Sequence, residues 1–248
     1  MARKTNSAPL KVLKWVGISL GTLLGVLILG LVLVPPLTRS FTDSWGATPH
    51  ETQMPLPGDE FIANPTSTST KAISIDAPGD LVYRLVIQIG YKRGGWYGWD
   101  WVYNATGSSD FVGGKHAERI VPELQRLRVG DTVAINQAVG YKVVELNPAG
   151  VAKPGWMLLQ GAMGPDGKTV DAANAPKGTV KMSWVWFIYP GQDGKTRLVL
   201  RIRGGGDSQG AFLDWLYGNP FDFGGAVMGY KTLAGIKKTA EKLAAPKK

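Results

Sequence analysis

The feature that most constrains this chain is a long apolar stretch near its start. No charged residue occurs from Trp15 to Thr38, and residues 15–34 are almost wholly apolar. A helix of about 20 residues, at about 1.5 Å per residue, crosses the roughly 30 Å of hydrocarbon in a bilayer. We therefore predict one transmembrane helix over residues 15–34.

A cleaved signal peptide is the alternative interpretation of this stretch. The apolar core of such a peptide is shorter, about 7–15 residues, and a cleavage site with small residues follows it. Here the stretch runs into LVPPLTRSF, which has no such site. A retained anchor is therefore favoured.

Charges beside the stretch predict its orientation. Residues 1–14 hold basic side chains and no acidic one: Arg3, Lys4, Lys11 and Lys14. After the span come one basic and one acidic residue, Arg39 and Asp43. By the positive-inside rule, we expect residues 1–14 to form a cytoplasmic tail of a single-pass plasma (inner) membrane protein, with the remaining chain extracytoplasmic.

Small residues recur within the predicted span. Gly17, Gly21 and Gly25 lie four residues apart on one helix stripe. This spacing lets two membrane helices approach closely, so a homodimer through these glycines is one interpretation. The favoured interpretation is that glycine is simply common in membrane helices.

The formal charge of +9 belongs to the two ends of the chain. Residues 231–248 hold six lysines and one glutamate, and residues 15–230 are balanced. We therefore expect no nucleic-acid partner. The chain has no cysteine and only two histidines, His50 and His116. This excludes thiol chemistry and disulfides, and we expect neither a metal nor a cofactor.

Composition divides the rest of the chain. Residues 35–70 are rich in Pro, Thr and Ser without sustained periodicity, so we expect a linker and N-terminal extension that adds little to the core. One folded domain is predicted over residues 71–243, a normal size for a single core, followed by a basic tail at 244–248.

The domain should open with a strand and a helix. KAISID, residues 71–76, has the pattern of a strand, and Asp76 and Pro78 suit a helix start. Apolar residues then recur at helical spacing: Leu81, Val82, Leu85, Val86 and Ile89. Gln88 shares their stripe, so its amide should face the interior.

The aromatic segment GYKRGGWYGWDWVYN, residues 90–104, is the main candidate site. A helix from about Trp96 would place one mixed polar and aromatic set on one face: Tyr97, Asp100, Trp101 and Asn104. Such a face is typical of a cavity wall with polar groups. The alternative is that Asp100 and Asn104 cap backbone groups inside a rigid aromatic plug.

Beyond residue 130 the period changes to two, which predicts about six strands in total. In MSWVWFIY, Trp184 and Trp186 alternate with Val185 and Phe187, and in TRLVLRIRG Arg201 alternates with leucines. Period two does not decide which face points inward. Residues 161–180 are expected to be a loop, and FDFGGAVMGYKTLAGIKKTAEKL predicts a long amphipathic C-terminal helix.

These segments together resemble a known family. The runs that carry the resemblance are GATPHE, LPGDE, KAISIDAPGDLVYRLVIQIGYKRGGWYGWDWVYN, RIVPELQRLRVGDTV, TRLVLRIR and KTLAGIKKTAE, within residues 46–243. They are similar to membrane-anchored members of the SRPBCC superfamily, which includes START lipid-binding proteins, birch pollen allergen and polyketide cyclases. The resemblance implies an α+β helix-grip fold, in which a curved antiparallel sheet wraps around a long C-terminal helix and leaves an apolar cavity between them.

The favoured hypothesis is a membrane-tethered domain that binds an apolar or amphipathic small molecule, such as a lipid. The candidate ligand-binding residues are Gln88, Tyr97, Asp100, Trp101, Asn104, Trp184, Trp186 and Arg201. A cyclase- or dehydratase-like enzyme with Asp100 as general acid or base is the alternative, since burial would raise the pKa of its carboxyl. A structural or protein-interaction module without a ligand also remains open, and His116 is expected to be a solvated loop residue.

Overall fold

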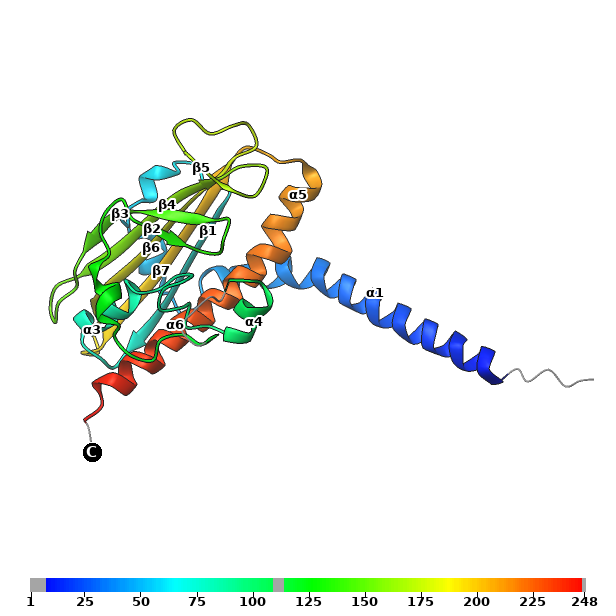
Figure 1. Cartoon of the computed structure of the whole chain (residues 1–248), viewed down its shortest axis with the longest axis horizontal. Helices are drawn as coiled ribbons and strands as arrows, with labels where there is room; N and C mark the ends of the chain where they lie inside the picture. Colours follow the sequence, from blue (N-terminus) through cyan, green and yellow to red (C-terminus); the bar gives the residue numbers. More distant parts are fainter. Residues whose placement is uncertain (1–7, 109–113, 247–248) are drawn as a thin grey trace, which may run out of the picture.

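The structure is a computed structural model that describes residues 8–108 and 114–246. A long helix projects from an α+β body built on one curved antiparallel sheet (Figure 1). The helical elements are α1 (Ala8–Asp43), α2 (Pro49–Gln53), η1 (Asp59–Phe61), α3 (Gly79–Val86), α4 (Asp100–Ala105), η3 (Pro122–Arg126), α5 (Ala211–Leu216), η4 (Tyr217–Phe221) and α6 (Asp222–Ala244). Parts of the predicted basic tails lie outside the described residues: Arg3, Lys4, Lys247 and Lys248.

Helix α1 contains the predicted span. Its 32 residues from Val12 to Asp43 have a mean hydropathy of 2.5 in the most apolar window, and that window is not buried against the domain. By length and composition the helix can cross a membrane. It continues past Val34 through Pro35 and Pro36, so the first nine positions of the expected linker, 35–43, are helical.

Two prolines usually end a helix, because each lacks an amide hydrogen. Here the last turns of α1 pack against η4 and α6. Arg39 also bridges to Asp222 on α6, with 3.7 Å between guanidinium nitrogen and carboxylate oxygen. Tertiary contact therefore stabilises the helix where local sequence would end it.

The sheet has seven strands in the order β1-β7-β6-β4-β3-β2, with β5 paired to β4, and every pairing is antiparallel. The strands are β1 (Ser67–Ile75), β2 (Thr132–Ala134), β3 (Gly140–Asn147), β4 (Gly155–Met163), β5 (Thr169–Val170), β6 (Val180–Pro190) and β7 (Thr196–Gly206). The sequence predicted one strand fewer because β5 has two residues, too few to show a period.

One face of the sheet packs against α3 and α6. Leu233 and Ile236 of α6 are fully buried against strand side chains such as Trp186 and Leu198. The predicted C-terminal helix and the period-two strands are confirmed, and the inward set on β6 and β7 is now fixed: Met182, Trp184, Trp186, Ile188, Leu198, Leu200 and Ile202.

Residues 45–62 run from beside β1, where Trp45 contacts Tyr230 of α6, onto the opposite face of the sheet and cover it. Leu56 packs there in a second apolar cluster with Val185 and Val199. Residues 35–70 are therefore more than a linker, although Leu56 and Ile62 are the only hydrophobic residues of this range in the buried core. This segment lacks periodicity because it is an irregular strap, held by a few buried side chains and by arginines of β7.

Glu51 is the centre of that strap. Its buried carboxylate accepts hydrogen bonds from Arg197 Nε at 2.7 Å, the Thr48 amide at 2.7 Å and the Tyr189 hydroxyl at 2.8 Å. Burial raises the pKa of Glu51, but these hydrogen bonds outweigh burial and lower it to about 2. The strap is thus fixed to the sheet by a charged group with several partners.

The two ends of the sheet differ. At the packed end, the C-terminal half of α6 lies on β1 and α3, and Lys237 Nζ donates to the Ser74 carbonyl oxygen at 2.7 Å. At the open end, α6 is preceded by η4 and α5. These two segments bend away from the sheet near the point where α1 leaves the domain (Figure 1). Segment η4 is a π-helix containing Pro220, a local irregularity that accounts for a bend.

Candidate functional site

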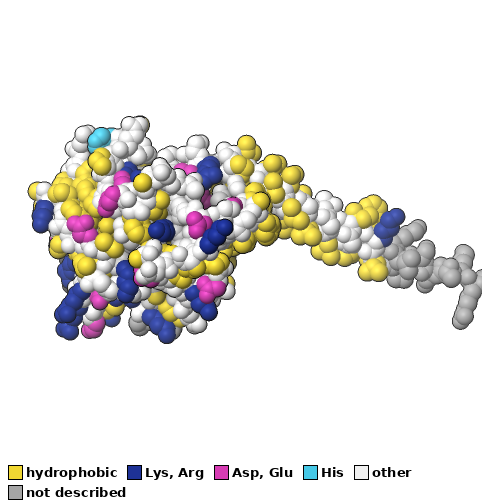
Figure 2. Space-filling model, turned by 90° about the horizontal axis from the view of Figure 1, so that it is seen from above, with side chains coloured by type: hydrophobic (Ala, Val, Ile, Leu, Met, Phe, Trp, Pro, Cys, Tyr) yellow, Lys and Arg dark blue, Asp and Glu magenta, His cyan; other side chains and the backbone are white. Residues whose placement is uncertain are grey.

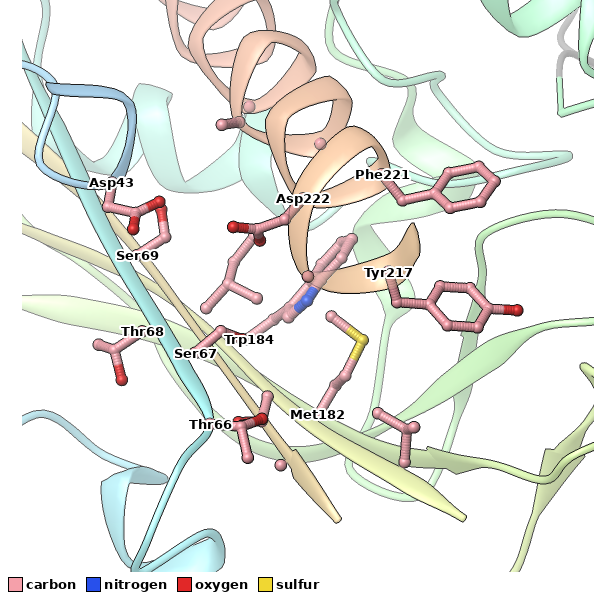
Figure 3. Close-up of a pocket in the computed structure, with 18 of the residues that line it drawn as sticks. Asp43, Thr66, Ser67, Thr68, Ser69, Met182, Trp184, Tyr217, Phe221 and Asp222 are labelled. Atoms are coloured by element: carbon pink, nitrogen blue, oxygen red, sulfur yellow. The ribbon is translucent and has the colours of Figure 1, made fainter. Parts of the chain in front are cut away.

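A cavity of about 770 Å³ occupies the open end, between the sheet and the first turns of α6. Asp43, Ser69 and Asp222 gather on one side of it, and Tyr217 and Phe221 lie on the other (Figure 3). Its size is that of a site for a small organic molecule, about 300–1,000 Å³.

The cavity exists because facing residues lack side chains. Gly225, Ala226 and Gly229 present α6 to the sheet there, and β7 ends in Gly204-Gly205-Gly206. A Cβ atom added at Gly225 would meet nothing within 4 Å. The same helix that buries leucine and isoleucine at the packed end therefore leaves space at the open end.

Aromatic side chains form the inner wall. The Trp96 and Trp184 rings meet edge to face with centroids 6.2 Å apart, and Tyr141 lies 5.5 Å from Trp184. The indole N–H groups of Trp96, Trp184 and Trp186 are buried and have no hydrogen-bond acceptor among the described residues. These nitrogens have almost no accessible surface, so the three rings present carbon atoms to the cavity and form an apolar wall.

A charged cluster forms the polar side of the cavity. Lys71 on β1 is buried and donates a hydrogen bond to the Ser69 hydroxyl. Burial lowers the pKa of Lys71, while the negative charges of Asp43 and Asp222 oppose that shift. Burial and the nearby Asp43 raise the pKa of Asp222, whereas Arg39 and Lys71 lower it.

The cluster therefore joins two cations to two carboxylates at one side of an apolar space. Arg39 lies 3.4 Å from Asp43 and 3.7 Å from Asp222. An apolar cavity with a charged group at one side suits an amphipathic molecule, with its tail on the tryptophans and its polar part at the cluster.

Only two of the residues that the sequence proposed for ligand binding lie in this cavity, Trp184 and Trp186. Gln88 is fully buried as predicted, but all its hydrogen-bonding capacity is used. Its Nε2 donates to the Tyr97 hydroxyl and to the Arg119 carbonyl oxygen, and its Oε1 accepts from the Val121 amide and from Gln125. Gln88 and Tyr97 therefore fix loops together outside the cavity.

The predicted helix from Trp96 is wrong. Helix α4 begins at Asp100, and Tyr97 has a φ of 56°, which no helix contains. The expected shared face of Tyr97, Asp100, Trp101 and Asn104 does not form, and Trp101 and Asn104 are exposed. Gly94, Gly95 and Gly98 allow a looped path that side-chain spacing alone did not reveal.

Asp100 instead pairs with His116. The Nδ1 atom of His116 lies 3.0 Å from Asp100 Oδ2, and the Tyr97 ring lies beside the imidazole. A smaller cavity of about 300 Å³ is lined by His116, Tyr97 and lysines of α6. His116 is thus a partly buried, paired residue, and its interpretation as a solvated loop residue is wrong.

Arg201 lies on the face of the sheet away from the cavity. Its guanidinium donates to the Met54 and Glu51 carbonyl oxygens, at 2.8 and 2.6 Å, and to Asp59 at 2.7 Å. It fixes the strap of residues 45–62, so it is a structural residue and not a ligand contact.

Sequence reasoning missed Lys71 as a site residue. Lys71, Ile73 and Ile75 share one face of β1, so a single cation on an apolar strand face was the available signal. Arg39, Asp43 and Asp222 gave no such signal, because only the fold brings the ends of α1 and α6 together.

No family model and no curated protein matches this chain. Solved structures with a partly similar chain path include a hypothetical protein from Helicobacter pylori, at 8% identity and a TM-score of 0.45, covering 78% of this chain and 99% of that one. Another is a protein from Mesorhizobium loti, at 12% identity and a TM-score of 0.37, covering 71% of this chain and 98% of that one. No family assignment follows from these values.

Proposed function

We propose that this protein is a membrane-tethered helix-grip domain of the SRPBCC type that holds a lipid or similar amphipathic molecule between its sheet and α6. The observation that carries the proposal is the cavity of about 770 Å³, with its aromatic wall and its charged side. The apolar wall of indole rings and the charged side with Arg39 and Lys71 support a ligand that has an apolar chain and a polar end.

A pair of neighbouring glycines on α6 allows a direct test. Gly225 lines the cavity and Gly224 does not, and an added Cβ meets nothing within 4 Å at either. Gly225→Phe should fill the cavity and lower the lipid that co-purifies with the full chain at least about tenfold, as read by native mass spectrometry. Gly224→Phe is the matched control and should retain the lipid. Equal retention by both variants would refute the cavity as the binding site.

The same proposal places the domain outside the cytoplasm, on the basic residues that precede the span. A reporter fused after Lys248 that functions only in the cytoplasm should be silent. Reporter activity would reverse the orientation.

A second candidate function is acid–base catalysis, favoured by the pair of Asp100 and His116 beside the smaller cavity. The carboxylate would orient the imidazole, which would move the proton. Incubation of the co-purified lipid with wild type should then give a product of altered mass, formed about 10²–10⁴-fold more slowly by Asp100→Asn. An unchanged mass leaves binding as the sole function.

A further inference from the structure

Exposed aromatic side chains collect at the edge of the domain from which α1 leaves. We call this set the aromatic edge: Phe41, Phe212, Trp215, Tyr217 and Phe221. These residues are between 38% and 69% exposed. The Phe212 and Trp215 rings stack with centroids 6.5 Å apart, and Tyr217 and Phe221 stack at 5.5 Å.

The position of α1 in the membrane determines how deep the aromatic edge lies relative to the hydrocarbon layer. The charge-free stretch ends at Thr38, and Phe41 follows three residues later, about 5 Å along the helix. Each headgroup layer of a bilayer is about 5–8 Å thick. When the end of the charge-free stretch, Thr38, lies at the hydrocarbon boundary, Phe41 and the η4 turns packed against α1 therefore lie at headgroup level.

Apolar surface is continuous from the span to the domain. Hydrophobic side chains run along α1 up to the edge of the body, and α5 lies on that same side (Figures 1 and 2). Aromatic rings with one polar and one apolar part are enriched at this depth of a membrane.

The same edge borders the mouth of the cavity. Tyr217 and Phe221 line the cavity, and so do Arg39 and Asp43 of α1. Residues of the anchor helix and of the aromatic segment therefore both form part of the cavity wall.

We propose that the aromatic edge sits in the headgroup layer and admits a glycerolipid from that leaflet directly into the cavity, with no passage through water. This inference rests on the proposed function and names its substrate class and route. The apolar and aromatic walls of the cavity accommodate an acyl chain of a glycerolipid, and its headgroup stays at the level of Arg39, Asp43, Lys71 and Asp222.

The test uses the full chain in nanodiscs that contain phosphatidylcholine with a photoactivatable acyl chain. After illumination, peptides are mapped by mass spectrometry. In wild type, label should appear on α1 and on the cavity strands β6 and β7. The double variant Phe212→Asp/Trp215→Asp puts charge on the aromatic edge without changing any cavity-lining residue. Its β6 and β7 label should fall at least about tenfold, while its α1 label stays as an internal measure of membrane insertion.

The matched control is Val129→Asp/Val151→Asp, which adds the same charges at exposed apolar residues elsewhere on the body. It should label as wild type does. Cavity labelling of the aromatic-edge variant from nanodiscs at the wild-type level would overturn lateral entry and leave the binding proposal intact. Absence of cavity label in wild type would instead overturn the binding proposal.

Detergent micelles carrying the same lipid separate entry from folding, because they bypass the bilayer. The aromatic-edge variant should label its cavity strands there as wild type does. If the double variant also loses its cavity label in micelles, the single variant Phe212→Asp is used in its place in both preparations. Nanodisc labelling of that single variant at the wild-type level would again overturn lateral entry.

Discussion

The two halves of α6 meet the same sheet in different ways. In the C-terminal half, Leu233, Ile236 and Ala240 are fully buried against strands and α3. In the N-terminal half, Gly225 and Gly229 face the sheet and leave the cavity. One helix thus joins a close-packed region to an open one.

The difference between the two halves of α6 explains how the domain can contain a cavity and remain folded. The packed end supplies apolar burial, and ion pairs and hydrogen bonds fix it on both faces of the sheet, through Glu51 with Arg197 and Lys237 with Ser74. The open end can therefore lack large side chains on α6, because the fully buried leucine and isoleucine of this helix lie at the packed end.

The largest effect should come from the packed end. Leu233→Ala should lower the free energy of unfolding by about 2–5 kcal/mol, because it removes a fully buried side chain and leaves a void. Urea unfolding of the full chain in detergent, followed by near-UV circular dichroism, measures this. A loss below about 1 kcal/mol would show that the two ends are alike.

Acid should weaken the packed end through Glu51. The pKa of Glu51 is about 2 in the folded protein against an ordinary value of 4.5. The folded state therefore binds this proton more weakly than the unfolded chain. Its stabilisation, about 3 kcal/mol, is complete above about pH 4.5 and is lost as the pH falls toward 2.

The check for Glu51 compares unfolding from about pH 6 to about pH 3 in wild type and Glu51→Gln. The variant should be less stable at about pH 6 and should lose less stability on acidification. If the free energy of unfolding fell equally with pH in both proteins, Glu51 would not be the cause of the acid sensitivity.

At the open end, truncation should matter less. Ile202 is half-buried and lines the cavity, so Ile202→Ala should cost about 1 kcal/mol, because little new void forms beside space that is already open. The same urea experiment measures it. A loss as large as that of Leu233→Ala would mean that the cavity region is packed in solution.

The smallest effect is expected on the solvent side of α6. Lys238 is exposed, and Lys238→Ala should change the free energy of unfolding by no more than about 0.5 kcal/mol. A larger loss would show that the polar side of the packed end also contributes to stability.

Periodicity predicted the regular parts of the molecule well. The apolar span, α3, the longer strands and α6 all followed from repeats of hydrophobic residues, since burial on one face imposes such repeats. The strap of residues 45–62 carries no repeat, and its role depends on arginines more than 130 positions away, such as Arg201.

The candidate site was predicted only where it lies on strands. Trp184 and Trp186 were recognised, but Asp100, Trp101 and Asn104 were assigned through a helix that begins later than expected. Local spacing cannot show a loop whose path depends on glycines and on the buried amide of Gln88. Nor can it show that the end of α1 meets the start of α6.

The continuity of α1 with the cavity has a mechanical consequence. The helix runs unbroken to Asp43 and is tied to α6 through Arg39 and Asp222, so anchor and cavity turn as one piece. A membrane helix changes its tilt when the thickness of the hydrocarbon layer changes. If α1 crosses a bilayer, a thicker membrane brings the helix upright and a thinner one inclines it, and the cavity mouth rotates with it relative to the lipid surface. The lipid composition of the membrane would then set the angle between the cavity and the lipid surface.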